Sequence, residues 1–483
     1  MAANGNVNNL DFTTFSNIIN GQATQTKSVR HGINPSNKTA LFPSPVSTGD
    51  DVTAAITAAR TAFGSWKKTP IELRKEKINA LCAGLLAHKA EFSRLLTTEQ
   101  GKPVQFAEQE VDFAAHWLAG TCQLDLPEDV VEDTPERYVT TRYVPLGVVV
   151  GIVPWNFPLM LLCGKLAPAV MAGNCIIIKP SPFTPYCGIK LVELAQRFFP
   201  PGVIQVLSGD DNLGPWLTAD PGIDKISFTG STATGKRVME SASKNLTRVT
   251  LELGGNDPAI VCSDADVEVV APQIAQAAFM NSGQICIAIK RIYVHKDIYD
   301  SFKDVFLKTL LSLKVGDGFQ DGTFLGPVQN ELQYDRVKEF LVDIQKNKQT
   351  VIAGGNIMES SGNGFFIQPT VVDNPPDASK IVVEEPFGPV VPLLQWSDVD
   401  EVIDRVNAND MGLGASVWTT DTGLAQQIAE NLDVGSVWMN AHLGIQPTAT
   451  FGGHKKSGIG REWGSDGLRG YCNSKTFFFK QTK

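Results

Sequence analysis

The sequence predicts an α/β protein with two parallel-sheet domains, and three observations support this. Short apolar runs alternate with helical patterns from residue 148 to about 262, an order typical of a parallel sheet with helices on both faces. The same alternation resumes from 267 to 440 and indicates a second α/β domain. The chain has 483 residues, which is more than one hydrophobic core usually supports.

The residues before the first sheet are predicted to be helical. Apolar side chains recur there at intervals of three and four residues, along 51–66, 74–100 and 107–120. We expect Asp50 or Asp51 to cap the first helix and Gly101 to end the second.

A strand of a different kind is predicted at 137–144, "RYVTTRYV". Its polar and apolar residues alternate, which favours an exposed or antiparallel strand over one inside a parallel sheet. The C-terminal run "KTFFFK" (475–480) is also strand-like, but its pattern alone does not say which sheet it joins.

The composition excludes several classes of partner. A net charge of −9 argues against nucleic acid, because phosphate binding needs clustered Lys and Arg. The longest apolar runs fall far short of the roughly 20 residues that span a bilayer, and the N-terminus has no secretory or transit pattern. We therefore expect a cytoplasmic protein that uses no membrane. The six histidines and eight cysteines show no metal-ligand spacing, so we expect no metal site.

One cysteine, Cys286, lies in an unusual context. It sits in "MNSGQICIA" (280–288), a polar turn with a glycine between a helical run and a strand. A structural cysteine favours apolar surroundings, whereas a reactive thiol needs room for its target and donors that favour its anion.

A possible phosphate site lies in "KISFTGSTATGKRV" (225–238), which has the pattern strand, glycine loop, helix. Gly230 and Gly235 would let the backbone approach a phosphate, and the amides that open the helix favour anions. A P-loop is disfavoured, because Arg237 stands where that motif needs a hydroxyl to hold Mg²⁺. A dinucleotide pyrophosphate is the favoured ligand, and a turn without a ligand is the alternative.

Three further loops carry polar residues at predicted strand ends. Asn156 lies in "GIVPWNFP", Glu252 begins "ELGGND", and "EEPFGPV" contains Glu385. Two of them have ordinary alternatives: Asn156 could cap the next helix, and Glu252 could be an ordinary loop acid.

Together and in this order, the motifs resemble those of the aldehyde dehydrogenase superfamily. They are "VPWNFP", "IIKP", "FTGSTATG", "LELGG", "NSGQIC", "EEPFGPV" and "FGGHKKSGIGRE". The resemblance runs from about Ile19 to Lys480, and it implies NAD(P)-dependent oxidation of an aldehyde. Members that pass the acyl group to coenzyme A commonly lack the glutamate that matches Glu252, so the hydrolytic type, with a carboxylic acid as product, is expected. A coenzyme A-acylating enzyme or a non-catalytic member is the alternative.

The resemblance implies three catalytic residues. Cys286 matches the nucleophile, whose sulfur adds to the aldehyde to give a hemithioacetal that becomes a thioester when hydride leaves. The side-chain amide of Asn156 and the backbone N–H of Cys286 match the donors to the developing alkoxide, each typically worth about 3 kcal/mol of barrier. Glu252 matches the general base for hydrolysis of the thioester.

The resemblance also implies NAD as the cofactor, with NADP possible. In the family, a lysine like Lys179 binds the adenosine ribose, a glycine loop meets the pyrophosphate, and a carboxylate like Glu385 holds the nicotinamide ribose. NAD-preferring members usually have a glutamate three residues after the lysine, which repels a 2′-phosphate, but here that residue is Pro182. The predicted cofactor residues are Ile152, Trp155, Lys179, Gly230, Ser231, Gly235, Glu385 and Phe387.

The expected substrate is an apolar, bulky or aromatic aldehyde. Gly164 stands where many members place Trp and where semialdehyde-dicarboxylate enzymes often place Arg, and no positive charge is visible between Asn156 and this glycine. An anionic tail would lack a partner there, whereas an apolar group would gain from burial. The predicted pocket residues are Phe157, Met160, Gly164, Ile285 and Ile287, with His116, Trp117 and His442 either at the entrance or in ordinary packing.

The family's three-part organisation gives the expected domains. They are a dinucleotide-binding domain (1–124 and 147–253), a catalytic domain (254–462) and an oligomerisation arm (125–146 and 463–483). In the family the arm strands join the sheet of a neighbouring subunit, so we expect a homodimer or a homotetramer. One further departure, Asn256–Asp257 in place of a frequent Lys–Ser pair, has no explanation from the sequence.

Overall fold

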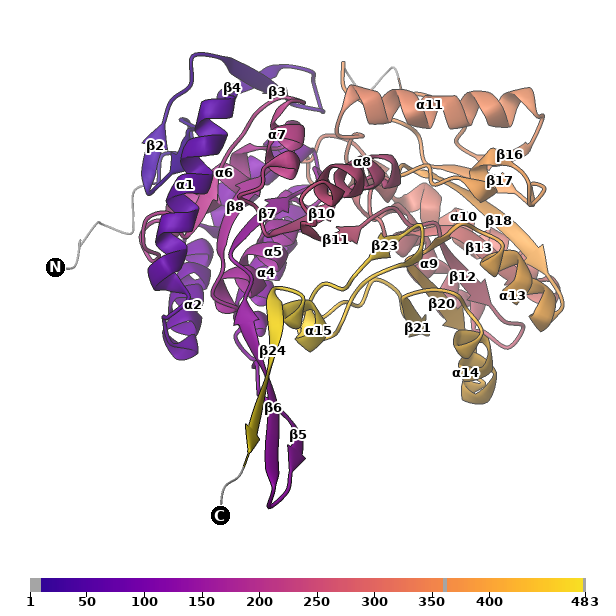
Figure 1. The fold of residues 1–483 in the computed structure, drawn as a ribbon. Helices are drawn as coiled ribbons and strands as arrows, with labels where there is room; N and C mark the ends of the chain where they lie inside the picture. Colours follow the sequence, from indigo (N-terminus) through magenta and orange to yellow (C-terminus); the bar gives the residue numbers. More distant parts are fainter. Residues whose placement is uncertain (1–9, 359–362, 481–483) are drawn as a thin grey trace.

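The computed structural model describes residues 10–358 and 363–480 (Figure 1). It contains two large sheets, each accompanied by helices, and a smaller three-stranded sheet. The prediction of two parallel-sheet units is therefore confirmed. The ends of the predicted domain ranges, 1–9 and 481–483, lie outside the described residues.

The first sheet has the strand order β2-β1-β9-β8-β7-β10-β11-β23, parallel from β9 to β11 and antiparallel at both edges. Its strands are β1 (Asn17–Ile19), β2 (Gln22–Thr24), β7 (Val148–Ile152), β8 (Cys175–Lys179), β9 (Ile204–Val206), β10 (Lys225–Thr229), β11 (Arg248–Glu252) and β23 (Gly458–Ile459).

The register of these strands places predicted site residues at one edge. Ile152 pairs with Lys179, and Thr229 pairs with Glu252, each at the carboxyl end of its strand. In parallel sheets, ligands bind outside these carboxyl ends, so the register brings the chemistry of separate strands to a common edge.

Eight helices belong to the first part of the chain, counted over the described residues 10–256. They are α1 (Gly49–Trp66), α2 (Ile71–Ala87), α3 (Lys89–Gln100), α4 (Val104–Thr121), α5 (Pro158–Met171), α6 (Tyr186–Ala195), α7 (Leu213–Ala219) and α8 (Thr232–Ser243).

Two predictions about these helices were wrong in detail. Thr48 caps α1, and Asp51 is its capping-box partner three residues on, because the hydroxyl reaches the Asp51 amide while the carboxylate reaches back to the Thr48 amide. The single helix predicted at 74–100 breaks at His88, whose backbone (φ −113°, ψ 23°) leaves the helical region. Gly101 ends α3 in the left-handed conformation at φ 90°, as predicted.

The second sheet has the order β16-β17-β18-β13-β12-β20-β21, and only β16 runs antiparallel to its neighbour. Its strands are β12 (Asp257–Val261), β13 (Ile289–His295), β16 (Thr350–Ala353), β17 (Thr370–Asp373), β18 (Val390–Trp396), β20 (Gly414–Trp418) and β21 (Ser436–Met439). Its helices are α9 (Val267–Phe279), α10 (Tyr299–Ser312), α11 (Glu331–Lys346), α12 (Lys380–Val383), α13 (Val399–Asn407) and α14 (Thr422–Glu430).

Short elements complete the fold. The pairs are β3 (Val29–Ile33) with β4 (Ala40–Pro45), β14 (Lys314–Val315) with β15 (Thr323–Leu325), and β19 (Met411–Gly412) with β22 (His454–Lys455). Two 3₁₀ turns, η1 (Met280–Gly283) and η2 (Lys296–Ile298), flank β13, and α15 (Gly464–Arg469) precedes the last strand. The strand β23 returns to the first sheet from within the range predicted as catalytic domain, and the domain boundaries stay predictions.

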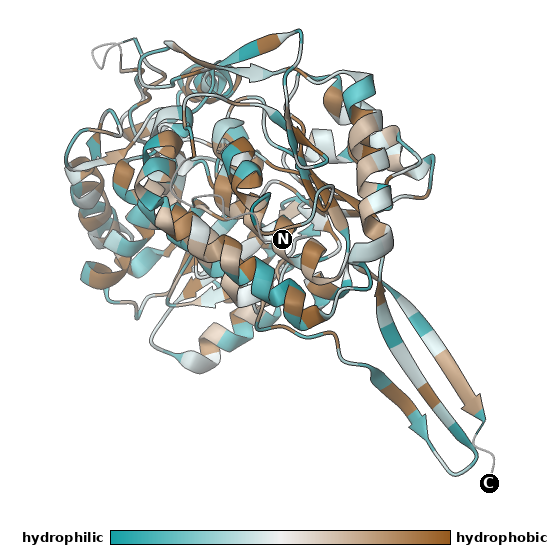
Figure 2. Ribbon diagram, turned by 90° about the vertical axis from the view of Figure 1, so that its left-hand side faces the viewer, coloured by the Kyte–Doolittle hydropathy of each residue, from teal (hydrophilic) through white to brown (hydrophobic). Residues whose placement is uncertain are grey.

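The third sheet projects from the body of the molecule (Figures 1 and 2). It consists of β5 (Asp129–Asp133), β6 (Arg137–Pro145) and β24 (Cys472–Lys480), all antiparallel, and β24 pairs with β6 along its whole length. This confirms the antiparallel strand predicted at 137–144 and shows where "KTFFFK" lies. Val131 and Phe478 are 66% and 70% exposed on it, and such exposed apolar side chains are typical of a contact surface. The predicted contact with a second subunit stays a prediction.

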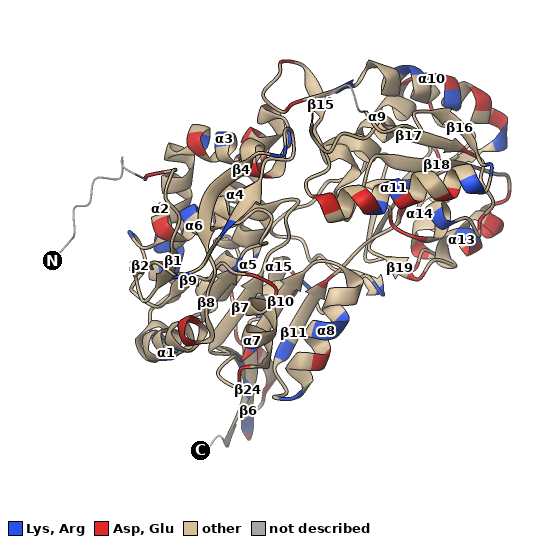
Figure 3. Ribbon diagram, turned by 90° about the horizontal axis from the view of Figure 1, so that it is seen from above, with Lys and Arg blue, Asp and Glu red and all other residues tan. Residues whose placement is uncertain are grey.

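Acidic and basic residues alternate on the outer helices, such as α8, α10 and α11 (Figure 3). In the described part of the chain, no helix is both long and apolar enough to cross a bilayer.

Candidate active site

Cys286 follows a turn of unusual backbone conformation. Helix α9 ends at Phe279, and Asn281, Ser282 and Gly283 then take left-handed conformations in succession, with φ of 51°, 56° and 72°. Such conformations cost free energy for residues with a Cβ and persist only where the surroundings enforce them. Gly283 also needs its missing side chain, because a Cβ would lie 2.3 Å from the carbonyl oxygen of Gly388.

The side chain of Gln284 helps to hold the turn in this conformation. Its amide donates to the carbonyls of Asn281 (2.9 Å) and Pro327 (3.3 Å), and its oxygen accepts from the Gln329 amide (2.9 Å). The Ser282 hydroxyl donates to Gly326 O at 2.7 Å. Buried polar groups that are satisfied in this way fix one geometry, so the turn holds the following cysteine in a defined place.

The half-buried Cys286 stands where two cavities meet. One has a volume of about 520 Å³ and the other of about 330 Å³. Both are lined by Cys286 and by four more residues: Asn156, Leu161, Thr229 and Leu253. A thiol in this position can be approached from two sides, which a buried structural cysteine does not require.

Asn156 lines both cavities together with Cys286 and is only 4% exposed. Its side-chain nitrogen donates to the carbonyl of Gln284 at 3.0 Å, which leaves its second amide hydrogen for another acceptor. Helix α5 begins two residues later with Phe157 at its N-cap and no side-chain cap, so the helix-capping alternative was wrong. The Asn156 carbonyl accepts a hydrogen bond from Lys102 Nζ at 2.9 Å. This second bond helps to fix the backbone around Asn156.

Glu252 lines the larger cavity at the end of β11. It is 4% exposed, and neither carboxyl oxygen has a hydrogen-bond partner among the described residues. Burial raises its pKa well above the ordinary value, the charge of Glu462 raises it further, and Lys165 opposes both. A carboxyl group with a raised pKa and free oxygens at a cavity has the properties of a general base. The alternative that Glu252 is an ordinary loop acid does not fit this burial.

The pKa of the Cys286 thiol is raised to about 12, because burial disfavours its anion and the positive charge of Lys290 offsets this only in part. These surroundings therefore favour the protonated thiol over its anion. The acids Glu385, Asp257 and Glu252 add to the rise. Activation of the sulfur thus depends on what enters the two cavities.

The smaller cavity has the features of a dinucleotide site. Gly230 and Ser231 line it at the N-terminus of α8, whose first amides favour an anion, and Ser231 Oγ accepts from the Thr234 amide at 3.3 Å. Glu385, Trp155 and Phe387 line it as well, and the two aromatic rings meet edge to face at 5.3 Å. An anion site, a carboxylate and an aromatic wall in one cavity fit a pyrophosphate, a ribose and a nicotinamide ring.

Three predicted cofactor residues lie outside the lining of this cavity. Ile152 and Lys179 lie at adjacent strand ends, and burial lowers the pKa of the lysine to about 8. Gly235 is a buried residue of α8, and a Cβ on it would lie 2.5 Å from Leu253 Cδ2. Its missing side chain therefore serves the packing of the helix on the strand end, and the structure does not place it in the phosphate loop.

The larger cavity is lined by four of the five predicted substrate residues: Phe157, Met160, Ile285 and Ile287. The fifth prediction was wrong, because Gly164 is covered by an indole. A Cβ on Gly164 would lie 2.8 Å from Trp463 Nε1. Trp463 itself lines the cavity, stacks on Phe451 (4.8 Å) and meets Trp117 edge to face (4.9 Å). The motif "FGGHKKSGIGRE" ends just before Trp463. This proximity to a family motif is the one sequence signal that could have indicated Trp463 as a pocket residue.

The charged groups of this lining are acids alone. Glu252 and Glu462 line the cavity, and no Lys or Arg does so in the described part of the chain. Exposed glutamines surround the opening: Gln109, Gln273, Gln276 and Gln446. An anionic tail would meet no cation here, in agreement with the absence of positive charge around Gly164.

Of the three residues considered for the entrance, only His442 lines the cavity. Its Nε2 donates to the Ile287 carbonyl at 2.6 Å, and burial lowers its pKa to about 3, so the ring is neutral. Trp117 is buried behind Trp463, and the exposed His116 pairs with Gln446. Among the residues that the structure describes, no cluster of side chains is suited to a metal ion.

The comparisons with known proteins agree with this geometry. A family model described as "Aldehyde dehydrogenase family" matches residues 22–477. The chain is 42% identical over 472 residues to a putative aldehyde dehydrogenase, FUS7, of Gibberella fujikuroi, covering 98% of this chain and all of the relative. Its structure resembles betaine aldehyde dehydrogenase from Staphylococcus aureus in complex with NAD⁺ (TM-score 0.94, 32% identity, 98% and 96% of the two chains covered). It also resembles an Escherichia coli NADP dependent enzyme (TM-score 0.95, 32% identity, 98% and 99% covered).

One prediction concerns the stability of the site rather than its activity. Asp257 is 1% exposed at the start of β12, and burial raises its pKa from 3.8 to about 8. Between these values the folded protein keeps a proton that the unfolded chain releases, so this residue lowers stability as the pH rises from about 4 to 8. Asp257→Asn removes that loss, and we expect its melting temperature at pH 8 to exceed the wild-type value by at least about 2 °C.

Thermal unfolding at pH 4 and pH 8 measures this effect. The gain should be much smaller at pH 4, and the exposed control Asp304→Asn should show no such pH dependence. An equal gain at both pH values would contradict the assignment.

Proposed function

The chain belongs to the aldehyde dehydrogenase family, and we propose that it oxidises an uncharged, apolar or aromatic aldehyde to the carboxylic acid with NAD⁺, and that it also accepts NADP⁺. One observation carries this proposal: Cys286 lies at the junction of two cavities, with Asn156 in the wall of both and Glu252 in the wall of the larger one.

The proposed reaction begins when the Cys286 thiol gives its proton to a water molecule and the resulting thiolate sulfur adds to the aldehyde carbon. The carbonyl oxygen then becomes an alkoxide, which the free amide hydrogen of Asn156 and the backbone N–H of Cys286 stabilise. Loss of hydride converts the hemithioacetal into a thioester on Cys286. When bound, the oxidised nicotinamide supplies the hydride acceptor.

Glu252 is the proposed base for the second half of the reaction. It takes a proton from a water molecule, whose oxygen attacks the thioester carbon and releases the carboxylic acid and the thiol. Its raised pKa suits this task, because a carboxylate with a raised pKa is a stronger base toward the proton of a water molecule than an ordinary one. A free carboxyl at this position also argues against a coenzyme A-acylating enzyme, whose turnover would depend on added coenzyme A.

The smaller cavity is the proposed site for the nicotinamide half of the cofactor. Gly230 and Ser231 would meet the pyrophosphate, Glu385 the ribose, and Trp155 and Phe387 the ring. Lys179, with Ile152 on the neighbouring strand, would lie at the adenosine end. Where NAD-preferring family members have a glutamate that repels a 2′-phosphate, this chain has Pro182, so both cofactors are expected to bind. The similar structures support this, since one is a complex with NAD⁺ and another is an NADP dependent enzyme.

The sheet organisation supports the proposed division of labour. We assign dinucleotide binding to 1–124 and 147–253, catalysis to 254–462, and subunit contact to the arm formed by 125–146 and 463–483. The exposed apolar face of the arm favours a homodimer or a homotetramer.

The nucleophile is tested by Cys286→Ala. Without the sulfur no hemithioacetal forms, so aldehyde-dependent NADH production should fall to background while NAD⁺ still quenches tryptophan fluorescence. Cys262→Ala changes a buried cysteine just after β12, away from both cavities; it is the matched control and should keep wild-type turnover. Turnover close to wild type in Cys286→Ala would exclude this residue as the nucleophile.

The role of Glu252 is tested by Glu252→Gln in a stopped-flow experiment. Acylation needs no base for water, so a burst of about one NADH per active site should appear, followed by steady-state turnover reduced by about 10²-fold or more. Glu430→Gln, on the exposed end of α14, should behave like wild type. An unchanged steady-state rate in Glu252→Gln would contradict its role as base.

The substrate class is tested with benzaldehyde and 4-oxobutanoate. We expect the enzyme to prefer benzaldehyde, because the lining offers aromatic contacts and no cation for a carboxylate. Trp463→Leu removes one aromatic wall and should lower kcat/KM for benzaldehyde by about 10-fold, from the lost apolar contact, with little effect on a short aliphatic aldehyde.

The control for this variant is Trp396→Leu, which removes a buried tryptophan of the second sheet that does not line the cavity. It should leave the ratio of the two kcat/KM values unchanged. A wild-type preference for 4-oxobutanoate would refute the proposed substrate class.

A further inference from the structure

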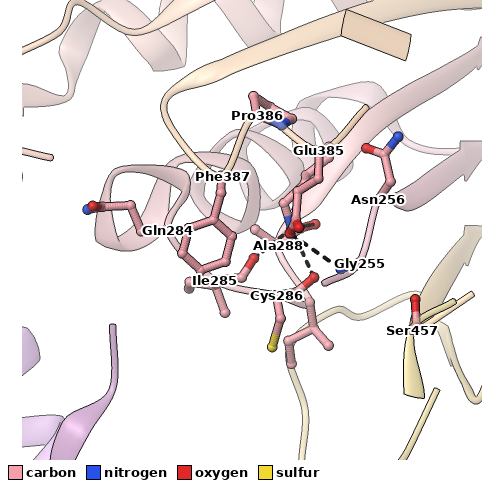
Figure 4. A network of polar contacts seen from close by, with 12 residues as sticks. Gly255, Asn256, Gln284, Ile285, Cys286, Ala288, Glu385, Pro386, Phe387 and Ser457 are labelled. Atoms are coloured by element: carbon pink, nitrogen blue, oxygen red, sulfur yellow. Dashed lines mark hydrogen bonds and ion pairs between the residues drawn. The ribbon is translucent and has the colours of Figure 1, made fainter. Parts of the chain in front are cut away.

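The carbonyl groups beside the nucleophile converge on one buried ammonium. Lys290, in β13, is 2% exposed, and its Nζ donates to the carbonyl oxygens of Ile285 at 2.6 Å and Cys286 at 2.9 Å. A third carbonyl, that of Ala288, lies at 3.5 Å. Figure 4 shows Ile285, Cys286 and Ala288 close to Glu385, with the Cys286 sulfur pointing away from the network of polar contacts.

The same ammonium also reaches the proposed cofactor site. Lys290 Nζ forms an ion pair with Glu385 Oε1 at 3.2 Å, and this oxygen accepts from the Gly255 amide at 3.4 Å (Figure 4). Two glycines allow this close approach. A Cβ on Gly254 would lie 2.3 Å from Glu385 Oε2, and one on Gly255 would lie 2.4 Å from Cys286 O.

The bond to Ile285 has a particular chemical consequence. The Ile285 carbonyl and the Cys286 N–H belong to one planar peptide group, in which oxygen and hydrogen point in opposite directions. A cation on the oxygen therefore fixes the direction of the N–H, and it polarises the peptide so that the N–H becomes a stronger donor. This N–H is the backbone donor that the proposed reaction directs at the alkoxide.

We propose that Lys290 is a positioning residue that aims and strengthens the Cys286 N–H and holds Glu385 ready for the ribose. The inference rests on the proposed function, since it assigns a role within the same reaction. One side chain would then link the nucleophile to the cofactor carboxylate, and neither partner could shift without disturbing the other.

The charges around Lys290 are consistent with this role. Glu385 and Asp257 are the acids that face it. Burial raises the pKa of both carboxyl groups, and the charge of Lys290 partly offsets this rise. It also favours the thiolate of Cys286. Without the ammonium, Glu385 would keep a proton more readily and accept hydrogen bonds from a ribose less well.

Two variants separate the charge from the hydrogen bonds. Lys290→Met removes both, whereas Lys290→Gln keeps a neutral donor that can still reach a carbonyl. The matched control is Lys190→Met, because Lys190 is also buried (1% exposed) but lies on α6 and pairs with Glu193. All variants are compared in the full-length protein by stopped-flow NADH bursts with benzaldehyde, together with the melting temperature and the dissociation constant for NAD⁺.

The proposal predicts that Lys290→Met keeps the burst amplitude but slows its rate by about 10-fold or more, since loss of a direct oxyanion donor typically costs 10²–10³-fold. Lys290→Gln should lie between this variant and wild type, the affinity for NAD⁺ should fall in both, and Lys190→Met should retain the wild-type burst rate. A purely structural role would lower the amplitude and the melting temperature without changing the burst rate.

Three results would overturn the proposal: a burst rate in Lys290→Met within two-fold of wild type, a reduced amplitude alone, or equal slowing in Lys190→Met. If Lys290→Met does not fold, Lys290→Gln decides by the same criteria. Failure of the proposed function is distinguishable, because the wild-type enzyme itself would then produce no NADH from an aldehyde.

Discussion

The left-handed turn at residues 281–283 is the constraint on which the site depends. Three consecutive positive φ angles are unfavourable on their own, and the fold compensates by satisfying the turn's polar groups from several elements. Gln284 connects it to the 326–329 segment, and the Asn156 side chain reaches it from the end of the first sheet. The turn thus joins the two sheet domains, and it directs the following cysteine into the space between them.

Burial sets the chemistry of this space. It raises the pKa values of Cys286, Glu252, Glu385 and Asp257 together and so favours the neutral forms of all four groups. Lys290 is the positive charge that counters this tendency on the cofactor side, and Lys165 does so for Glu252. A resting thiol that stays protonated is protected from adventitious electrophiles, and ligands in both cavities would complete the environment that its anion requires.

The sequence predicted the sheets and the residues at strand ends well, because alternating apolar runs and motif spacing are local properties. Asn156, Glu252, Glu385 and Cys286 could be singled out for this reason. The errors arose where a distant residue decides the outcome. Nothing near Gly164 in the sequence indicated that Trp463, almost 300 positions later, would cover it. Gly235 was predicted to meet a phosphate because its close contact with Leu253 forms only in the folded protein. Lys290 resembled an ordinary residue at the start of a strand, and only the folded turn brings three carbonyls to it.

The central claim is that the two cavities hold different ligands that meet at the sulfur. A crystal structure of the Cys286→Ala protein with both NAD⁺ and benzaldehyde tests it most directly. The account predicts a nicotinamide beside Glu385 and Phe387, an aromatic ring against Trp463, and a carbonyl carbon within about 3–3.5 Å of the place where the sulfur would stand, with its oxygen toward Asn156. Both ligands in one cavity, or an aldehyde group directed away from residue 286, would contradict it.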